Sequence, residues 1–237
     1  MLHNKKVVII GGSSGIGLET ARLALMHGSE VIIASRSEGK LQRAKDQLGG
    51  NVTIHVLDTM QEQQVQSFFE KVGPIDHLVV TAAETSGGSF IDTDTAAARQ
   101  LFENKFWGQF YAAKYGAPKI AGNGSITLFS GVVAYKSMIG SATLGAVNAA
   151  VSNLGQTLAL ELAPIRINVV SPGIIDTPSR SKMAEEVRNK FYTDLGNKLP
   201  TGRVGKAEDV AQAVLYAMQN GFVTGTVLHV EGGHVLI

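Results

Sequence analysis

Short runs of β-branched and apolar residues alternate along this chain with longer stretches in which apolar positions recur at helical spacing. Several of the short runs are almost continuously apolar, as expected for parallel strands that helices cover on both faces. Repeated strand–helix units of this kind form right-handed crossovers. The pattern therefore predicts an α/β fold, a doubly wound parallel sheet of about seven strands with helices on both faces.

The expected elements can be placed by residue number. Strands are expected at residues 6–10, 30–34, 52–57, 77–80, 125–129, 165–170 and 226–230, and helices at residues 16–27, 40–48, 62–72, 96–119, 143–162 and 207–220. Thr59 stands three residues before Glu62 in capping-box spacing, and Asp94 stands before an Ala-rich helix. Residues 1–237 are predicted to form a single domain, with one lid-like insertion near residues 177–203.

The composition excludes several classes of function. The chain has 237 residues, of which 27 are Gly and none is Cys, so a disulfide framework, a thiolate zinc site and a Cys nucleophile are excluded. Its 21 basic and 20 acidic residues are evenly spread and indicate neither a nucleic-acid partner nor an acidic membrane surface. The six histidines show no metal-ligand spacing, and no metal site is predicted.

The N-terminal segment does not have the pattern of a targeting signal. Lys5 and Lys6 precede an apolar run, but that run is only residues 7–10, too short for a signal-peptide core. No stretch approaches the roughly 18 uninterrupted apolar residues of a membrane span. The protein is expected to stay in the cytoplasm, with no membrane partner.

Glycines mark the turn between the first strand and the first helix, where residues 11–17 read Gly-Gly-Ser-Ser-Gly-Ile-Gly. A tight strand–helix turn can by itself demand glycine. In this context, however, glycines also let the backbone approach a pyrophosphate, which the helix N-terminus stabilises. We predict a dinucleotide-binding Rossmann fold in which the loop holds the cofactor through Gly11, Ser13, Ser14, Gly15, Ile16 and Gly17.

The end of the second strand indicates which dinucleotide binds. A carboxylate at this point would hold the ribose 2′-hydroxyl of NAD, but this chain has Ser35, Arg36 and Ser37. A guanidinium and two hydroxyls suit the 2′-phosphate of NADP(H), since charge-assisted hydrogen bonds contribute roughly 1.5–3 kcal/mol each. We predict NADP(H) as the cofactor; in the alternative interpretation, Arg36 is a solvated loop cation.

These motifs, in this order, resemble the short-chain dehydrogenase/reductase family from Lys5 to the C-terminus. Gly11, Gly15 and Gly17 have that family's glycine spacing, and Asn104 matches its helix asparagine, which supports a proton-relay water. Further cofactor contacts are implied by the resemblance. They are Asp58 and Thr59 at the adenine, Ala82 in an altered form of the family's Asn-Asn-Ala-Gly turn, and Pro172, Gly173, Ile175 and Thr177 at the nicotinamide.

The resemblance fails at the active site. The family uses a Ser to orient the carbonyl, a Tyr to donate the proton, and a Lys four residues later to lower the pKa of the tyrosine. Residues 124–130 resemble the strand that leads to the serine, and residues 158–162 resemble the end of the catalytic helix. Counting from these anchors without a gap places Gly131, Leu144 and Asn148 at the three positions.

Three groups near these positions are candidates to replace the missing chemistry. Tyr135, in the loop before the catalytic helix, is a candidate for the general acid. In the alternative interpretation, it is an ordinary loop tyrosine. Ser130 offers a hydroxyl one residue before the expected serine, and water held by Asn104 offers a proton. General acid catalysis is worth roughly 10²–10⁴-fold, so its loss would weaken carbonyl reduction without abolishing hydride transfer.

Three functions therefore compete. The first is an NADPH-dependent reductase of a small carbonyl or related unsaturated substrate with a non-standard proton donor. The second is a catalytically inactive NADP(H)-binding sensor or partner subunit, and the third is a lyase or isomerase on the same fold. The family commonly forms tetramers through helices that match residues 96–119 and 143–162, which implies a homo-oligomer, a tetramer or a dimer.

Overall fold

The computed structural model describes residues 2–81 and 87–237, and these form the predicted single-domain Rossmann fold. A parallel seven-stranded sheet has the order β3-β2-β1-β4-β5-β6-β9. Its strands are β1 (Lys6–Ile10), β2 (Glu30–Ser35), β3 (Val52–Val56), β4 (Ile75–Val80), β5 (Ile120–Phe129), β6 (Arg166–Pro172) and β9 (Val227–Val230).

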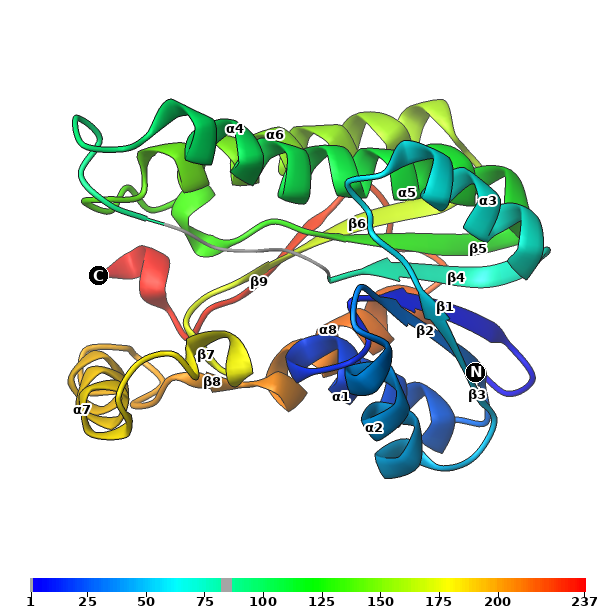
Figure 1. Ribbon diagram of the computed structural model, residues 1–237, viewed down its shortest axis with the longest axis horizontal. Helices are drawn as coiled ribbons and strands as arrows, with labels where there is room; N and C mark the ends of the chain where they lie inside the picture. The colour runs from blue at the N-terminus through cyan, green and yellow to red at the C-terminus, as the bar shows by residue number, and fades with distance from the viewer. Residues whose placement is uncertain (1, 82–86) are drawn as a thin grey trace.

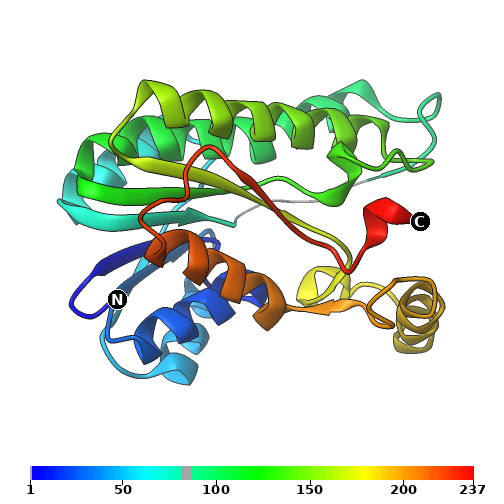
Figure 2. The same ribbon diagram turned by 180° about the vertical axis from the view of Figure 1, so that it is seen from behind.

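Helices cover both faces of this sheet (Figure 1). One layer contains α3 (Glu62–Val72), α4 (Thr95–Phe102), α5 (Gly108–Gly116) and α6 (Ala142–Glu161), and the other contains α1 (Gly15–Met26), α2 (Glu38–Leu48) and α8 (Ala207–Gln219). Figure 2 shows α1 and α8 side by side beneath the sheet. Strand β1 explains the two layers: Val8 and Ile10 pack into one core, and Val7 and Ile9 into the other.

The helix expected at residues 96–119 is interrupted in the structure. Its middle, Glu103–Trp107, is a π-helical segment (η1), and a 3₁₀ turn at Ala117–Lys119 (η2) follows α5. A π-helix places one extra residue in a turn, and within this segment the adjacent side chains of Asn104 and Lys105 are both buried. Strand β5 begins at Ile120, earlier than expected, because its exposed first residues lack the apolar pattern that marks a buried strand.

Of the two predicted helix caps, one is confirmed. The carboxylate of Asp94 accepts a hydrogen bond from the Ala96 N–H at 2.9 Å. The prediction of a capping box that begins at Thr59 is wrong, because Gln61 is the N-cap of α3. Thr59 is instead buried beside Gly108, and a Cβ added at Gly108 would lie 2.9 Å from the Thr59 Oγ1.

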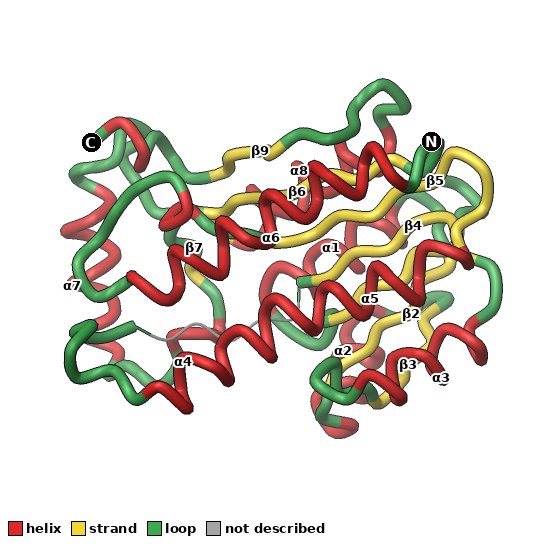
Figure 3. The backbone as a smooth tube through the Cα atoms, turned by 90° about the horizontal axis from the view of Figure 1, so that it is seen from above, coloured by secondary structure: helices red, strands yellow, loops and turns green. Residues whose placement is uncertain are grey.

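The insertion at residues 177–203 begins and ends at a small second sheet. Strand β7 (Ile175–Asp176) pairs with β8 (Gly205–Lys206), and between them lie a 3₁₀ turn at Pro178–Arg180 (η4) and helix α7 (Glu185–Gly196). Figure 3 shows α7 at the end of the molecule away from the N-terminus, where the parallel strands finish. A last 3₁₀ turn, η5 (His234–Leu236), follows β9, and a short one, η3 (Val132–Ala134), follows β5.

No helix among the described residues is long and apolar enough to cross a membrane.

His77 on β4 is a buried titratable group of the sheet. Its side chain is 5% exposed, and its Nδ1 lies 2.9 Å from the Ser125 hydroxyl on β5, the residue with which it pairs across the two strands. Burial lowers the pKa of His77 to about 4, although the neighbouring Asp76 acts in the opposite direction. The folded protein therefore holds this ring neutral well below the pH at which it protonates in the unfolded chain.

This difference predicts a specific loss of stability in acid. The contribution of neutral His77 is fully present above a pH of about 6.5 and falls as pH decreases toward 4, because the unfolded chain binds the proton first. Between pH 7.5 and pH 4.5, the free energy of unfolding should decrease by about 2–3 kcal/mol less in His77→Asn than in the wild type. Urea unfolding at the two pH values measures this, with the exposed His3→Asn as control. Equal losses in all three proteins would contradict it.

Candidate functional site

A cavity of about 1110 Å³ lies where the parallel strands end. It is bordered by the glycine loop after β1, the ends of β2, β5 and β6, the start of α6, and the insertion with η4 and α7. In the strand order, β1 has β2 on one side and β4 on the other, so the chain reverses its direction of winding there. In open α/β sheets the crevice outside this reversal is where ligands bind.

The glycine loop has a backbone that only glycine accommodates. Gly11 and Gly15 have positive φ angles of 92° and 54°. A Cβ on Gly17 would lie 2.3 Å from the Gly11 carbonyl oxygen and 2.6 Å from the Thr81 hydroxyl. Ser14 is the N-cap of α1, and its side chain makes no capping hydrogen bond. The first-turn N–H groups of this twelve-residue helix therefore suit an anion from outside the helix.

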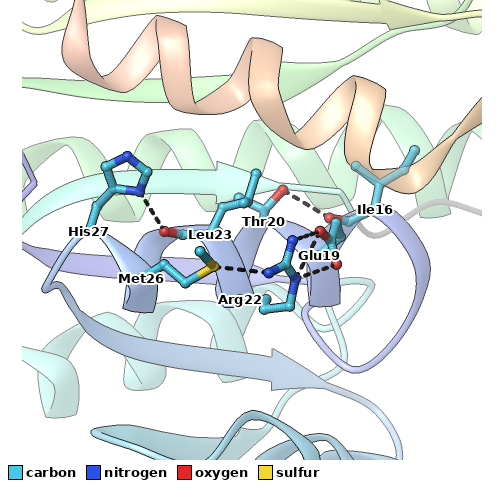
Figure 4. A network of polar contacts seen from close by, with 7 residues as sticks. All are labelled: Ile16, Glu19, Thr20, Arg22, Leu23, Met26 and His27. Carbon is cyan, nitrogen blue, oxygen red and sulfur yellow. Dashed lines mark hydrogen bonds and ion pairs between the residues drawn. The ribbon is translucent and has the colours of Figure 1, made fainter.

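Side chains along α1 reinforce the helix that carries this N-terminus (Figure 4). The Thr20 hydroxyl donates to the Ile16 carbonyl at 2.8 Å, and the Arg22 guanidinium donates to the Glu19 carboxylate. At the other end, the His27 ring Nδ1 lies 2.9 Å from the Leu23 carbonyl. These contacts span three or four residues, so they support the helix itself rather than tie it to a neighbour.

Among the described residues, all charged side chains that line the cavity are basic. Among the described lining residues there are five basic side chains and no Asp or Glu. Arg36, Lys40 and Arg43 lie at the β2–α2 side, whereas Lys105 and Arg180 come from η1 and the insertion. Such a lining favours a ligand with several negative charges.

The predicted residues at the end of β2 all line the cavity. The Oγ of Ser35 is buried and has no hydrogen-bond partner among the described residues, so it is available to a ligand. Arg36 is exposed beside it, and the Ser37 hydroxyl accepts a bond from the Lys40 N–H at 3.4 Å as the N-cap of α2. The same segment therefore both begins a helix and presents polar groups to the cavity.

Of the two residues expected at the adenine, the structure places one at the cavity and one outside its lining. Thr59 lines the cavity, as does Leu57 before it. Asp58 is not among the lining residues, and its Oδ1 accepts a bond from the Met60 N–H at 3.1 Å. The contact predicted for Asp58 therefore stays a prediction, and Ala82 lies outside the described residues.

The segment expected at the nicotinamide also lines the cavity. It contributes Pro172, Gly173, Ile175 and Thr177, as well as Ser179 and Arg180 of η4. The hydroxyls of Thr177 and Ser179 lie 2.9 Å apart. A Cβ on Gly15 would be 3.4 Å from the Cβ of Thr177, so this segment closes directly over the glycine loop.

Gly131, Leu144 and Asn148, the residues at the three positions counted from the sequence, meet in one wall of this cavity. A Cβ on Gly131 would lie 2.8 Å from the Asn148 Nδ2, so glycine here complements the asparagine. The Asn148 Oδ1 is buried without a hydrogen-bond partner among the described residues. None of the described lining residues is a tyrosine.

The structure separates the three predicted catalytic residues. Asn104 lines the cavity and is buried, with its Nδ2 3.9 Å from the Met60 sulfur. Ser130 also lines it, but its hydroxyl donates to the Asn148 carbonyl at 2.8 Å and accepts from Ser152. Tyr135 is 43% exposed, is not a lining residue, and packs edge-on against His229 with ring centroids 4.5 Å apart.

The sequence did not single out Lys105. This side chain lines the cavity yet is only 4% exposed, and its Nζ donates to the Ser130 carbonyl at 3.0 Å. Burial lowers the pKa of the Lys105 ammonium to about 8. The available signal was the pair Asn104-Lys105 inside a helix, but a lysine in a helix is exposed in most proteins, so its type gave no sign of burial.

The chain is similar to known proteins over nearly its whole length. A family model described as Enoyl-(Acyl carrier protein) reductase matches residues 11–234. The 3-oxoacyl-(acyl-carrier-protein) reductase FabG of Thermotoga maritima is 32% identical over 248 residues, which cover 99% of this chain and 99% of that protein.

Solved structures with similar sequences share the fold. A small-chain dehydrogenase in complex with NADPH has a TM-score of 0.84 and 36% identity, covering 99% of this chain and 100% of that chain. The apo structure of a short chain oxidoreductase from Pseudomonas aeruginosa PAO1, described as containing an atypical catalytic center, has a TM-score of 0.88 and 26% identity. That match covers 97% of this chain and 96% of the other.

The packing of the glycine loop predicts the effect of one added methyl group. In Gly17→Ala, the Cβ meets backbone at Gly11 and the Thr81 hydroxyl, so the loop or α1 must shift. We expect the free energy of unfolding to fall by about 1–3 kcal/mol. Gly221→Ala is the matched control, because a Cβ at that position meets nothing within 4 Å, and it should stay within about 0.5 kcal/mol of the wild type. Equal stability of the two variants in urea unfolding would show that the loop is not tightly packed.

Proposed function

This chain belongs to the short-chain dehydrogenase/reductase family, and from that premise we propose that it transfers hydride from NADPH to a small carbonyl compound or a related unsaturated substrate. The observation that carries the proposal is the cavity, which combines a glycine loop at a helix N-terminus with five basic lining side chains and no acidic one among the described residues. NADPH carries a pyrophosphate and a 2′-phosphate, and both match this charge. A similar protein of known structure is a complex with NADPH.

The 2′-phosphate fits the end of β2. The Arg36 guanidinium, the unpartnered Ser35 hydroxyl and the Ser37 hydroxyl supply donors there, and Lys40 and Arg43 add positive charge from α2. A carboxylate would repel the phosphate, and none of the described lining residues carries one. These residues distinguish NADPH from NADH in our proposal.

The remaining cofactor contacts follow the walls of the cavity. We assign the pyrophosphate to the loop of Gly11, Ser13, Ser14, Gly15 and Ile16, where the cradle admits no Cβ at Gly17. The backbone at Ile175 and the hydroxyl of Thr177 are assigned to the carboxamide of the nicotinamide. Asp58 keeps its predicted role at the adenine, and Ala82 keeps its predicted role as a cofactor contact in the altered Asn-Asn-Ala-Gly turn. When bound, NADPH supplies the hydride that reduces the substrate carbon.

The proton requires a non-standard donor. With Gly131, Leu144 and Asn148 at the family's Ser, Tyr and Lys positions, no tyrosine from the described residues lines the cavity. The predicted role of Tyr135 has no support from its position beside His229, and the Ser130 hydroxyl is already bonded to α6. Asn104 remains in place to hold a water. The similar short chain oxidoreductase from Pseudomonas aeruginosa is described as containing an atypical catalytic center, which supports a departure from the family's usual residues.

A second candidate function is an inactive NADP(H)-binding sensor or partner subunit. The observation that favours it is the same absence of a lining tyrosine among the described residues. Both candidates predict NADPH binding, so turnover distinguishes them. A lyase or isomerase would act without net oxidation of NADPH.

We also propose a homo-oligomer that associates through α4, α5 and α6. Four aromatic rings, contributed by η1 and α5, pack against one another along this surface, and Trp107 among them is 36% exposed. The rings belong to Phe106, Trp107, Phe110 and Tyr111. Aromatic side chains of this kind are enriched in subunit interfaces.

The cofactor assignment predicts a selective effect of Arg36→Ala. Loss of a charge-assisted bond to the 2′-phosphate should weaken NADPH binding about 10- to 100-fold and leave NADH binding within about threefold. Fluorescence titration of both dinucleotides measures this. Lys45→Ala is the control, because Lys45 is exposed on α2 and is not a lining residue. An unchanged ratio of the two affinities in Arg36→Ala would remove Arg36 from the proposal.

The reaction itself is tested by NADPH oxidation with aldehydes, ketones, quinones and imines. We expect turnover with activated carbonyls or imines above that with simple ketones, because these substrates depend less on a strong acid. Saturable NADPH binding with no oxidation by any member of the panel would favour the sensor over the reductase.

A further inference from the structure

Two consecutive polar side chains enter the same buried region from η1. The segment Glu103–Trp107 has i→i+5 bonding, and both Asn104 and Lys105 in it are buried and line the cavity. Such π-helical segments are frequent at functional sites.

The Lys105 ammonium is only partly used by the protein. It has three N–H donors, and its one partner among the described residues is the Ser130 carbonyl, 3.0 Å away. Among the described residues, no carboxylate pairs with the Lys105 ammonium. A buried charge without a counter-ion is unfavourable, so a fold that keeps one beside a ligand cavity points to a role for the charge.

That role is not needed to hold the end of β5. The neutral Gln109, one helical turn after Lys105, already does this: its Oε1 accepts the Phe129 N–H at 2.7 Å, and its Nε2 donates to the Phe129 carbonyl at 3.0 Å. Gln109 is buried but does not line the cavity. The two side chains therefore bind the adjacent residues Phe129 and Ser130, and of the two only Lys105 also lines the cavity.

We propose that Lys105 is the proton donor of the reaction. The inference rests on the proposed function. As the carbonyl carbon gains the hydride and NADPH becomes NADP⁺, the π electron pair moves to the oxygen, which takes a proton from the Lys105 Nζ. The N–H bond breaks, the O–H bond of the alcohol forms, and the neutral amine regains a proton from water. Asn104, beside it in η1, is the group placed to hold that water.

The residues at positions 131 and 148 of the cavity are complementary to this assignment. A lysine at position 148 would place a second ammonium in the cavity with Lys105, and two like charges would disfavour each other's protonation. Asn148 is neutral, and a Cβ at residue 131 would lie 2.8 Å from its Nδ2, so glycine there leaves room for this side chain. The substitutions at these two positions are therefore consistent with a cation that enters from η1.

The groups around Lys105 leave burial as the cause of its low pKa, which is about 8. Its Nζ donates to the carbonyl of Ser130 at the end of β5, and the Ser130 hydroxyl is in turn bonded to the neutral Asn148 and Ser152 of α6. The nearest acidic residue in sequence, Glu103, is exposed, and Arg180 of η4 is another cation that lines the cavity. An acid of this pKa is protonated at neutral pH yet releases its proton readily.

Lys105→Met tests the assignment, because methionine keeps most of the buried volume and removes the proton. We expect NADPH binding to stay within about threefold and kcat/KM for a reactive aldehyde to fall about 10²–10⁴-fold. In the wild type, kcat/KM should decrease tenfold per pH unit above about pH 8, and this decrease should be absent from the residual activity of the variant. Lys105→Gln is the second variant if Lys105→Met does not fold.

Gln109→Met is the matched control, since it removes the other buried side chain that holds the end of β5. Gln109→Met should lower stability but keep the decrease in kcat/KM above about pH 8, because Lys105 is still present. If the role of Lys105 were purely structural, Lys105→Met would not remove this decrease either. Lys105→Met with wild-type kcat/KM, or with the wild-type pH profile, would overturn the assignment while leaving the reductase intact. A wild-type protein that binds NADPH but reduces no member of the panel would overturn both.

Discussion

The requirement that apolar strands be covered on both faces determines the position of every functional group in this protein. Val7 and Ile9 pack against one helical layer, and Val8 and Ile10 pack against the other, so β1 has no face left for solvent. Parallel strands covered in this way must be joined by crossover helices, and all seven therefore end at one edge of the sheet. The glycine loop, the end of β2, the Ser130–Gly131 turn and the segment after β6 meet at that edge because the packing brings them there.

Charge then gives this edge its chemistry. The described residues that line the cavity include basic side chains at both the β2–α2 side and the η1 side, but no carboxylate. The first group is exposed and suits a phosphate that stays hydrated. Lys105 is buried, and its pKa is lowered to about 8 by that burial. In our proposal, one sign of charge thus supports two roles: binding of an anion by the exposed basic side chains, and proton transfer from the buried one.

The sequence predicted the parts of the structure that depend on local spacing. Continuous apolar runs placed the strands, and the Gly11–Gly17 spacing placed the loop that opens α1. Predictions failed where a tertiary contact decided the outcome. Thr59 is buried against Gly108 instead of capping α3, and the helix expected at residues 96–119 contains a π-helical turn. Lys105 was missed because its burial follows from the packing of η1 against the end of β5, where its Nζ bonds the Ser130 carbonyl, and not from a pattern in the residues.

The loop between β5 and α6 shows the same limit. Counting from flanking residues placed Gly131, Leu144 and Asn148, and the structure brings these three together in one wall. The count gives the sequence distance of Tyr135 from this wall but not the direction of its side chain. Packing against His229, contributed by β9, decides that direction, and β9 is far away in the sequence. Side-chain direction in a loop follows from such long-range neighbours, which no local pattern records.

The central claim is that this cavity delivers hydride from NADPH to a carbonyl carbon while the protein supplies the proton. The most direct test is a single turnover with NADPH deuterated at the transferring position and a reactive aldehyde, with the alcohol product analysed by mass spectrometry and NMR. Our account predicts one deuterium on the carbinol carbon and a solvent hydrogen on the oxygen. An aldehyde that remains unreduced while the labelled NADPH stays bound and intact would contradict it.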